Sequence, residues 1–283
     1  MSDMLTTGQP AVWLPTFEAN LVINPLRAAS VAMQAIGGQK FAPQRTHDYA
    51  VPTVTADPTV AWLEEGDELA TTSQTLGEDR DHFHKVGGLV VISREMARDT
   101  NPDVAEQIGE GLAAAIAHKI DAAYFGTRAD STTPPRGLGD IAGITTAPGT
   151  YADLDAFSEA ILNAASVGSN VSTWVCNTNT ATRLVTLKTA QGSAQALLQA
   201  DPTGQASTTI AGRPLLISDT ITDNTVFGLP HDGSSQIIVR EDIEVESDAS
   251  VYFTRDKVVI KATARVTTVY PHAAAIQEIL LTD

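Results

Sequence analysis

The chain has 283 residues, of which 43% are hydrophobic and 5% aromatic, and its formal net charge is −16 at pH 7. This length and apolar content predict one large or two modest folded domains and exclude wholesale disorder. Electrostatic binding to nucleic acid requires clustered Lys and Arg, so a charge of −16 argues against that function. We expect the acidic surface to favour solubility and to make copies of the chain repel one another.

The single cysteine, Cys176, follows Trp174 and Val175 in an apolar run. This setting predicts a buried small hydrophobe rather than a nucleophile. One cysteine excludes an internal disulfide and a Cys-rich zinc site, which indicates folding in a reducing cytoplasm. No basic residue precedes Arg27, and no apolar run approaches the ~18 residues of a membrane span, so we expect neither export nor a membrane partner.

The first part of the chain, 1–40, is predicted to be an extended arm. Pro10, Pro15 and Pro25 punctuate it, and a short helical patch from Leu26 to Ile36 ends at a pair of glycines. An arm of this length seldom packs only on itself, so we expect it to meet another molecule.

The pattern from Phe41 to Val54 predicts a strand within the segment 41–56. The next segment, 57–85, is too polar and too long for an ordinary turn. Up to Asp81 it carries eight acidic residues against the single Arg80. Apolar residues in such a loop, together with the acids between them, are expected to contact a neighbouring molecule. The expected contact residues are Trp62, Leu63, Glu64, Glu65, Asp67, Glu68, Leu69 and Phe83.

Two features of this loop raise the alternative of a metal site. His82 and His84 would face the same side of a strand, a spacing that can hold a metal, but no third or fourth ligand is evident. The acidic cluster lacks the alternating spacing and central glycine of a calcium loop. No GxSxG, phosphate-loop, HExxH or dinucleotide motif is present. We therefore expect no catalytic, metal-binding or cofactor-binding residues, and a metal-dependent enzyme built on the two histidines is the alternative from another class.

The strongest helix signal runs from Asn101 to Phe125, after a short β run at Leu89 to Ser93. Asn101 is a good N-cap and Pro102 suits the first helical position. An apolar stripe at every fourth residue predicts a long helix, about 35 Å, that serves as a spine and must be covered. The stripe comprises Val104, Ile108, Leu112, Ile116, Ile120 and Tyr124. A turn-rich bridge, Thr127 to Gly143, then indicates a change of domain.

The rest of the chain is mixed and ends in β structure. Helices are expected around Leu154 to Ala165 and from Asn179 to Lys188, with strands at Thr173 to Cys176 and Gly212 to Ser218. This order favours an α+β layer. The strongest β signal, Gln236 to Tyr270, predicts a long hairpin that lies along the spine helix.

The order of these parts resembles the major capsid proteins of tailed bacteriophages with the HK97 fold, over nearly the whole chain. The segments that carry the resemblance are AWLEEGDEL, VISREMARD, HKIDAAYFGT, PRGL, WVCNTNTATRLVTLK, AGRPLLIS, VREDIEV, VYFTRD and VYPHAAA. No single segment is specific, and the evidence lies in their order and spacing.

The resemblance implies an α+β, HK97-like capsid fold with an N-terminal arm, an extended loop, a peripheral domain with a spine helix and β-hairpin, and an axial domain. The implied parts are an arm (1–40), a peripheral strand (41–56), the extended loop (57–85), the peripheral domain with the spine helix (86–137), the axial domain (138–235), the peripheral hairpin (236–265) and a return to the axial domain (266–283).

The implied function is a structural shell protein that self-assembles into an icosahedral shell of hexamers and pentamers around double-stranded phage DNA. The implied partners are other copies of the chain, a portal protein, a scaffolding protein and a decoration protein, with assembly in the host cytoplasm. Because the arm begins almost at Met1, a separate scaffolding protein or none is implied. Relatives that crosslink covalently use a lysine in the extended loop, and Asp57 to Asp81 has none. The alternative on the same fold is a bacterial nanocompartment shell, similar to encapsulin, that packages an enzyme.

Overall fold

The computed structural model describes residues 30–38, 40–42, 47–56, 60, 62, 75–95, 104–128, 133–187 and 208–282. The helices in these parts are α2 (Val31–Ala35), α4 (Val104–Phe125), α5 (Asp155–Ser166) and α6 (Thr178–Val185), with 3-10 turns η1 (Leu138–Asp140), η2 (Phe253–Arg255) and η3 (Ala273–Ala275). The strands are β1 (Lys40–Phe41), β2 (Asp48–Ala56), β3 (Thr75–His82), β4 (His84–Ser93), β5 (Thr145–Thr150), β6 (Val171–Cys176), β7 (Thr209–Ile210), β8 (Arg213–Ile217), β9 (Thr225–Pro230), β10 (Gln236–Asp248), β11 (Lys257–Val269) and β12 (Gln277–Thr282).

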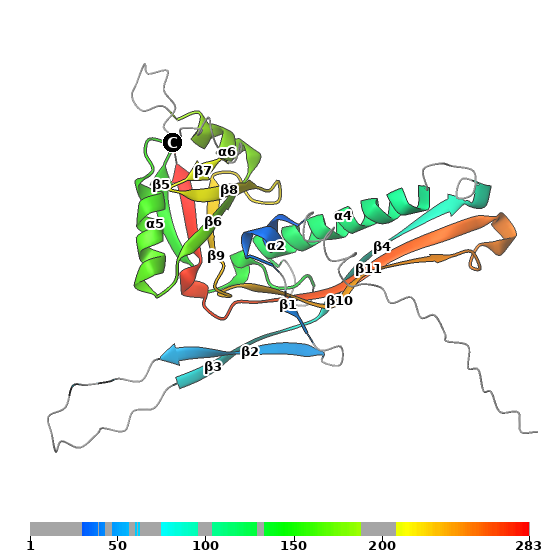
Figure 1. Cartoon of the computed structure of the whole chain (residues 1–283), viewed down its shortest axis with the longest axis horizontal. Helices are drawn as coiled ribbons and strands as arrows, with labels where there is room; N and C mark the ends of the chain where they lie inside the picture. Colours follow the sequence, from blue (N-terminus) through cyan, green and yellow to red (C-terminus); the bar gives the residue numbers. More distant parts are fainter. Residues whose placement is uncertain are drawn as a thin grey trace, which may run out of the picture.

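The described strands form three sheets. A four-stranded sheet has the order β1-β10-β11-β4, a six-stranded sheet has the order β5-β12-β9-β6-β8-β7, and β2 pairs with β3 alone. Figure 1 shows the six-stranded sheet with α5 and α6 at one end of the molecule and the four-stranded sheet extending away from it beneath α4. The β2–β3 hairpin lies apart from both sheets.

Helix α4 confirms the predicted spine from Val104 to Phe125, and Asn101 and Pro102 lie outside the described residues. Its 22 residues span about 33 Å at 1.5 Å per residue. The apolar stripe is buried in its C-terminal half, where Ile116 and Ile120 are 3% exposed and Tyr124 is fully buried. No helix in the described parts of the chain is long and apolar enough to cross a membrane.

The predicted C-terminal hairpin is confirmed as β10 and β11, which pair antiparallel from Gln236↔Val269 to Asp248↔Val259. It lies along α4, as expected (Figure 1). Ala262, Ala264 and Val266 of β11 belong to the same buried cluster as the α4 stripe. Small residues allow the helix and sheet to approach closely.

The six-stranded sheet is covered on both faces because side chains along a strand alternate between faces. On β6, Trp174 and Cys176 pack in the cluster beside α5, while Val175 joins the cluster that contains the α4 stripe. The Trp174 ring meets Phe157 of α5 edge-to-face, with centroids 5.1 Å apart. A Cβ on Gly228 would lie 2.5 Å from the same indole, so β9 requires glycine there. The prediction for Cys176 is confirmed: the thiol is buried, and burial raises its pKa to about 12.

The last described strand returns to the six-stranded sheet. β12 inserts between β5, with which it runs parallel, and β9, with which it runs antiparallel. Ile279 is fully buried in the cluster beside α5. The end of the chain therefore closes the sheet that the segment 138–235 begins.

The β2–β3 hairpin begins earlier in the sequence than the extended loop expected over 57–85. The strand expected over 41–56 as part of the peripheral sheet is split: only β1 joins that sheet, while β2 pairs with β3 from Asp48↔His82 to Ala56↔Thr75. Pro52 lies in the middle of β2 and has no N–H to donate, so it is tolerated only in an edge strand. In a two-stranded sheet every strand is an edge.

The short helix α2 is fixed to the spine by one carboxylate. Asp121 of α4 accepts hydrogen bonds from the Ser30 hydroxyl at 2.6 Å and from the backbone N–H groups of Val31 at 2.8 Å and Ala32 at 3.1 Å. The Ser30 hydroxyl oxygen in turn accepts from the Met33 N–H. These bonds satisfy first-turn donors that have no partner within the helix. Burial raises the pKa of Asp121, and its three donors act in the opposite direction.

We predict that Asp121→Ala lowers the free energy of unfolding by about 2 kcal/mol, because it removes a cap and leaves buried N–H groups without acceptors. Chemical denaturation of the unassembled subunit measures this loss. Asp219→Ala is the matched control, since Asp219 forms an exposed pair with His118 on the same helix. Equal stability of the two variants would contradict the role given to Asp121.

Candidate functional site

Two carboxylates on β3 anchor the base of the β2–β3 hairpin. Asp81 is 7% exposed and accepts hydrogen bonds from Arg128 Nη2 at 2.9 Å and from the Arg136 backbone N–H at 3.2 Å. Asp79 accepts from Arg136 Nη2 and from the Tyr270 backbone N–H, both at 2.6 Å. The anchor joins β3 to the bridge after α4 and to the end of β11.

The backbone carbonyl of Arg136 also contacts the end of β11 and the residue after it. It accepts hydrogen bonds from the Thr268 hydroxyl at 2.5 Å and the Tyr270 hydroxyl at 2.9 Å. Removing one partner of a buried ion pair is strongly destabilising because the other charge is left uncompensated. The geometry therefore fixes the direction in which the hairpin leaves the body.

An aromatic contact supports the same base. The Phe83 ring, between β3 and β4, meets Tyr49 of β2 edge-to-face with centroids 6.5 Å apart. The Arg240 guanidinium carbon lies 5.8 Å from the Phe83 ring centroid. The expected contact residue Phe83 is thus half-buried against its own chain, and its contact with a neighbour stays a prediction.

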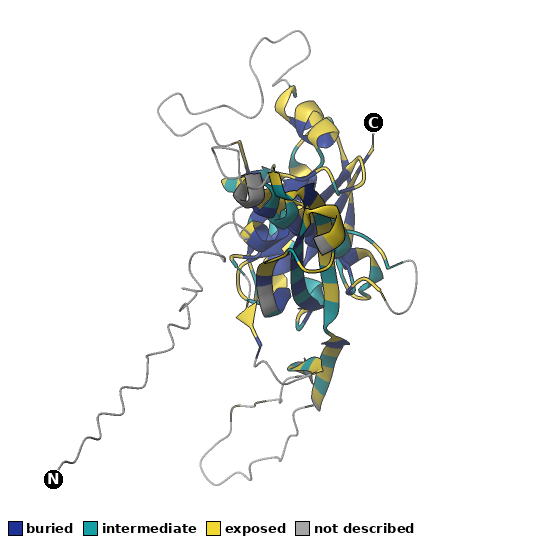
Figure 2. Cartoon of the chain, turned by 90° about the vertical axis from the view of Figure 1, so that its right-hand side faces the viewer, coloured by how far each residue is buried: buried dark blue, intermediate teal, exposed yellow. Residues whose placement is uncertain are grey.

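Beyond this base, exposed and half-buried residues alternate along the hairpin (Figure 2). At its far end Trp62 is 103% exposed and Val60 is 89% exposed, and Leu76 of β3 is 66% exposed. The other expected contact residues lie outside the described residues; they are Leu63, Glu64, Glu65, Asp67, Glu68 and Leu69. The structure therefore places one expected contact residue, Trp62, fully in solvent in the single subunit.

The two histidines do not share a strand. His82 ends β3 and its Nδ1 lies 2.6 Å from Asp48 Oδ1, whereas His84 begins β4 and its Nε2 lies 3.8 Å from Asp81 Oδ1. The described residues contain no group of three or more potential metal ligands. The His84 side chain is 10% exposed. Burial lowers its pKa, with Arg128 adding to this effect and Asp81 opposing it.

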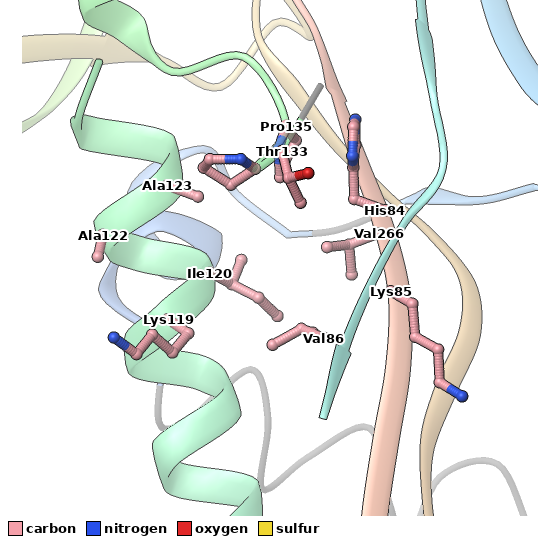
Figure 3. A pocket seen from close by; sticks show the side chains of 11 residues that line it. His84, Lys85, Val86, Lys119, Ile120, Ala122, Ala123, Thr133, Pro135 and Val266 are labelled. Carbon is pink, nitrogen blue, oxygen red and sulfur yellow. The ribbon is translucent and has the colours of Figure 1, made fainter. Parts of the chain in front are cut away.

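A pocket of about 340 Å³ lies beside the hairpin base, between α4 and β4 (Figure 3). Its walls include Ile120 and Ala123 of α4, Val86 of β4 and Val266 of β11, with Pro135 above them. The pocket is therefore largely apolar, and His84 contributes a ring at one end.

The sequence pattern predicted one polar loop up to Asp81, whereas the structure places Asp79 and Asp81 in strand β3. Their side chains are 18% and 7% exposed and are paired with arginines. The signal was their spacing: residues two apart on a strand share a face, here the face that turns to the body. Arg136 lies far away in sequence, so only the fold identifies it as the partner.

A family model described as the phage capsid family matches residues 11–279, which is most of the chain. The chain belongs to the phage capsid family. It is a major capsid protein, a structural protein of the virion shell, and it self-assembles into a shell. No curated protein matches the sequence.

Solved structures similar to this capsid protein share its HK97-like fold. The capsid of a native GTA particle is 18% identical, with a TM-score of 0.71 and 90% of each chain covered. A structure titled Microbacterium phage Oxtober96 is 16% identical, with a TM-score of 0.72 over 89% of this chain and 91% of that one. One titled Mycobacterium phage Bobi is 17% identical, with a TM-score of 0.67 over 90% and 91%. The predicted fold class is confirmed.

We predict that His84 makes the subunit lose stability on acidification. Because its pKa is lowered in the folded state, the unfolded chain binds more protons between the ordinary His pKa, about 6.5, and the folded value. Stability from this group is present above that window and is lost as pH falls through it. Chemical denaturation between pH 7.5 and 5 should show a smaller loss for His84→Gln than for the wild type.

His47→Gln, at an exposed histidine before β2, is the matched control. If His84→Gln loses as much stability on acidification as the wild type, His84 does not cause the effect.

Proposed function

We propose that this capsid protein forms the hexamers and pentamers of an icosahedral shell around double-stranded DNA, and that the β2–β3 hairpin binds a neighbouring copy. The hairpin is isolated from the other sheets: in the described parts of the chain, β2 and β3 form a two-stranded sheet of their own. This observation carries the proposal. A two-stranded hairpin is marginally stable alone, and exposed apolar residues mark interaction sites. A neighbour that covers Val60, Trp62 and Leu76 would supply the missing contacts.

The two larger sheets support a division into two domains. We assign α4 and the four-stranded sheet to a peripheral domain and the six-stranded sheet to an axial domain that converges at the centre of each capsomer. The return of the chain through β12 supports placing 266–283 with the axial domain. In this proposal the extended loop begins near Asp48, because β2 pairs only with β3 among the described strands.

The enclosed DNA is held without sequence-specific contacts. A net charge of −16 on each subunit repels phosphates, and specific binding would require clustered cations. A portal protein, a scaffolding protein and a decoration protein are the partners expected for such a shell. Assembly in the host cytoplasm agrees with a single buried thiol, Cys176.

The nanocompartment alternative gains no support from the comparisons, which match phage and GTA capsids. Purified shells distinguish the two functions directly, because a nanocompartment would contain an enzyme in place of a genome.

We predict that the expressed protein, with its scaffold where one is needed, forms closed shells and that Leu63→Asp prevents them. An aspartate in an apolar contact places a charge where burial is costly. Electron microscopy and size-exclusion chromatography measure shell yield, and circular dichroism should show an unchanged fold. Leu63→Met, which conserves volume, is the control and should assemble. Unfolding of Leu63→Asp would place the loop in the core, and a wild-type monomer under all conditions would refute shell formation.

We also predict that shells melt at a lower temperature in about 0.01 M salt than in about 0.15 M salt, since the Debye length grows from about 8 Å to about 30 Å. The longer range lets acidic surfaces of adjacent subunits, each with a net charge of −16, repel one another. At equal ionic strength Mg²⁺ should stabilise shells more than Na⁺. Thermal melts with light scattering test this, and shells destabilised by salt would show that interface acids are paired with Lys and Arg.

A further inference from the structure

The pocket beside the hairpin base has the properties of a docking site for one aromatic side chain. Its volume of about 340 Å³ is at the lower end of the range for small-ligand pockets. Figure 3 shows Ile120 and Ala123 of α4 facing Val86 and Val266 across the gap, so the inner surface is apolar. An apolar cavity open to water favours an apolar occupant.

The two sides of the pocket are positively charged. Lys119 on α4 and Lys85 on β4 line it and are exposed, and their ammonium groups point away from the centre on opposite sides (Figure 3). Neither lysine has an ion-pair partner among the described residues. Two such cations are notable in a chain with 18 Lys and Arg against 34 Asp and Glu. The pocket therefore suits an apolar group that is flanked by acids.

We propose that Trp62 of a second copy of this chain occupies the pocket; this rests on the proposed function, that the hairpin binds a neighbouring subunit. Trp62 is 103% exposed in its own subunit, and buried tryptophans are common anchors of protein interfaces. Glu64 and Glu65 lie two and three residues after Trp62 in the sequence, so in this arrangement they are the acids that would face the lysines at the pocket edge. Apolar burial supplies affinity, and the charges favour the correct orientation.

The hairpin itself indicates that the occupant comes from another copy. His84, which lines the pocket, lies at the base of the hairpin, whereas Trp62 lies beyond its far end. The eight residues of β3 carry the tip about 26 Å away at ~3.3 Å per residue. The anchor at Asp79 and Asp81 fixes the base and so directs the tip away from the subunit's own pocket.

Disulfide trapping between two variants that each carry one introduced cysteine tests the proposal. Shells are assembled from an equal mixture of Trp62→Cys and Ala123→Cys subunits, so that a 62–123 disulfide forms only between copies. The native Cys176 is fully buried and does not compete. We expect a covalent dimer on a non-reducing gel from the mixture and none from either variant assembled alone. Leu76→Cys, exposed within strand β3 and not in the segment between β2 and β3 that carries Trp62, should give no dimer with Ala123→Cys.

The outcomes separate this proposal from the one on which it rests. Shells that form without a 62–123 dimer overturn the pocket assignment and leave the proposed function intact. A dimer from Trp13→Cys with Ala123→Cys in its place would assign the pocket to the N-terminal arm and likewise overturn it. Wild-type protein that never forms shells refutes both.

A mutant cycle keeps the test decisive if the cysteine variants assemble poorly. Ala123→Phe fills the pocket and Trp62→Ala removes the anchor, so each should reduce shell yield at least tenfold with an unchanged circular dichroism spectrum. The double variant should assemble no worse than the poorer single variant, because both changes remove the same contact. Fully additive losses would show that the two residues act at different places and would overturn the proposal.

Discussion

Burial of the C-terminal half of α4 is the constraint on which the rest of the molecule depends. Ile116, Ile120 and Tyr124 enter one cluster with residues of α2, β6, β9, β10 and β11. The same helix therefore supports the long β10–β11 hairpin and the six-stranded sheet at once. Because interiors are close-packed, movement of the hairpin relative to the sheet would disturb this shared cluster. Asp121 extends the constraint by fixing α2 against the helix through three hydrogen bonds.

The β2–β3 hairpin is held by polar contacts at its base, whereas α4 is held by apolar burial. Its base is held by buried carboxylate–arginine pairs, and its far end exposes Trp62 and Val60. Ion pairs and hydrogen bonds give direction at little gain in net stability, whereas apolar area gives affinity when a partner covers it. A rigid base with an exposed Trp62 and Val60 at the far end suits a protein that must stay folded as a free subunit and then bind many copies of itself.

The charge of −16 limits how such a shell holds together. Repulsion between subunits has a range set by salt, whereas apolar burial acts only on contact. Four of the chain's cations lie around the hairpin base. Arg128 and Arg136 hold the hairpin base, and Lys85 and Lys119 flank the apolar pocket next to it.

The sequence alone determined the elements whose signals are periodic. The stripe of Ile116, Ile120 and Tyr124 predicted the spine, and alternating β-branched residues predicted β10 and β11, because burial of one face imposes a period on the chain. It also indicated that Trp62 lies in a polar segment and needs a partner. Only the tertiary structure decided the pairing of β2 with β3, the insertion of β12 between β5 and β9, and the contact of Asp79 with Arg136. These contacts join residues that are distant in sequence. The sequence around a carboxylate is the same whether the carboxylate lies in solvent or beside an arginine, so only the fold shows which of these environments it has.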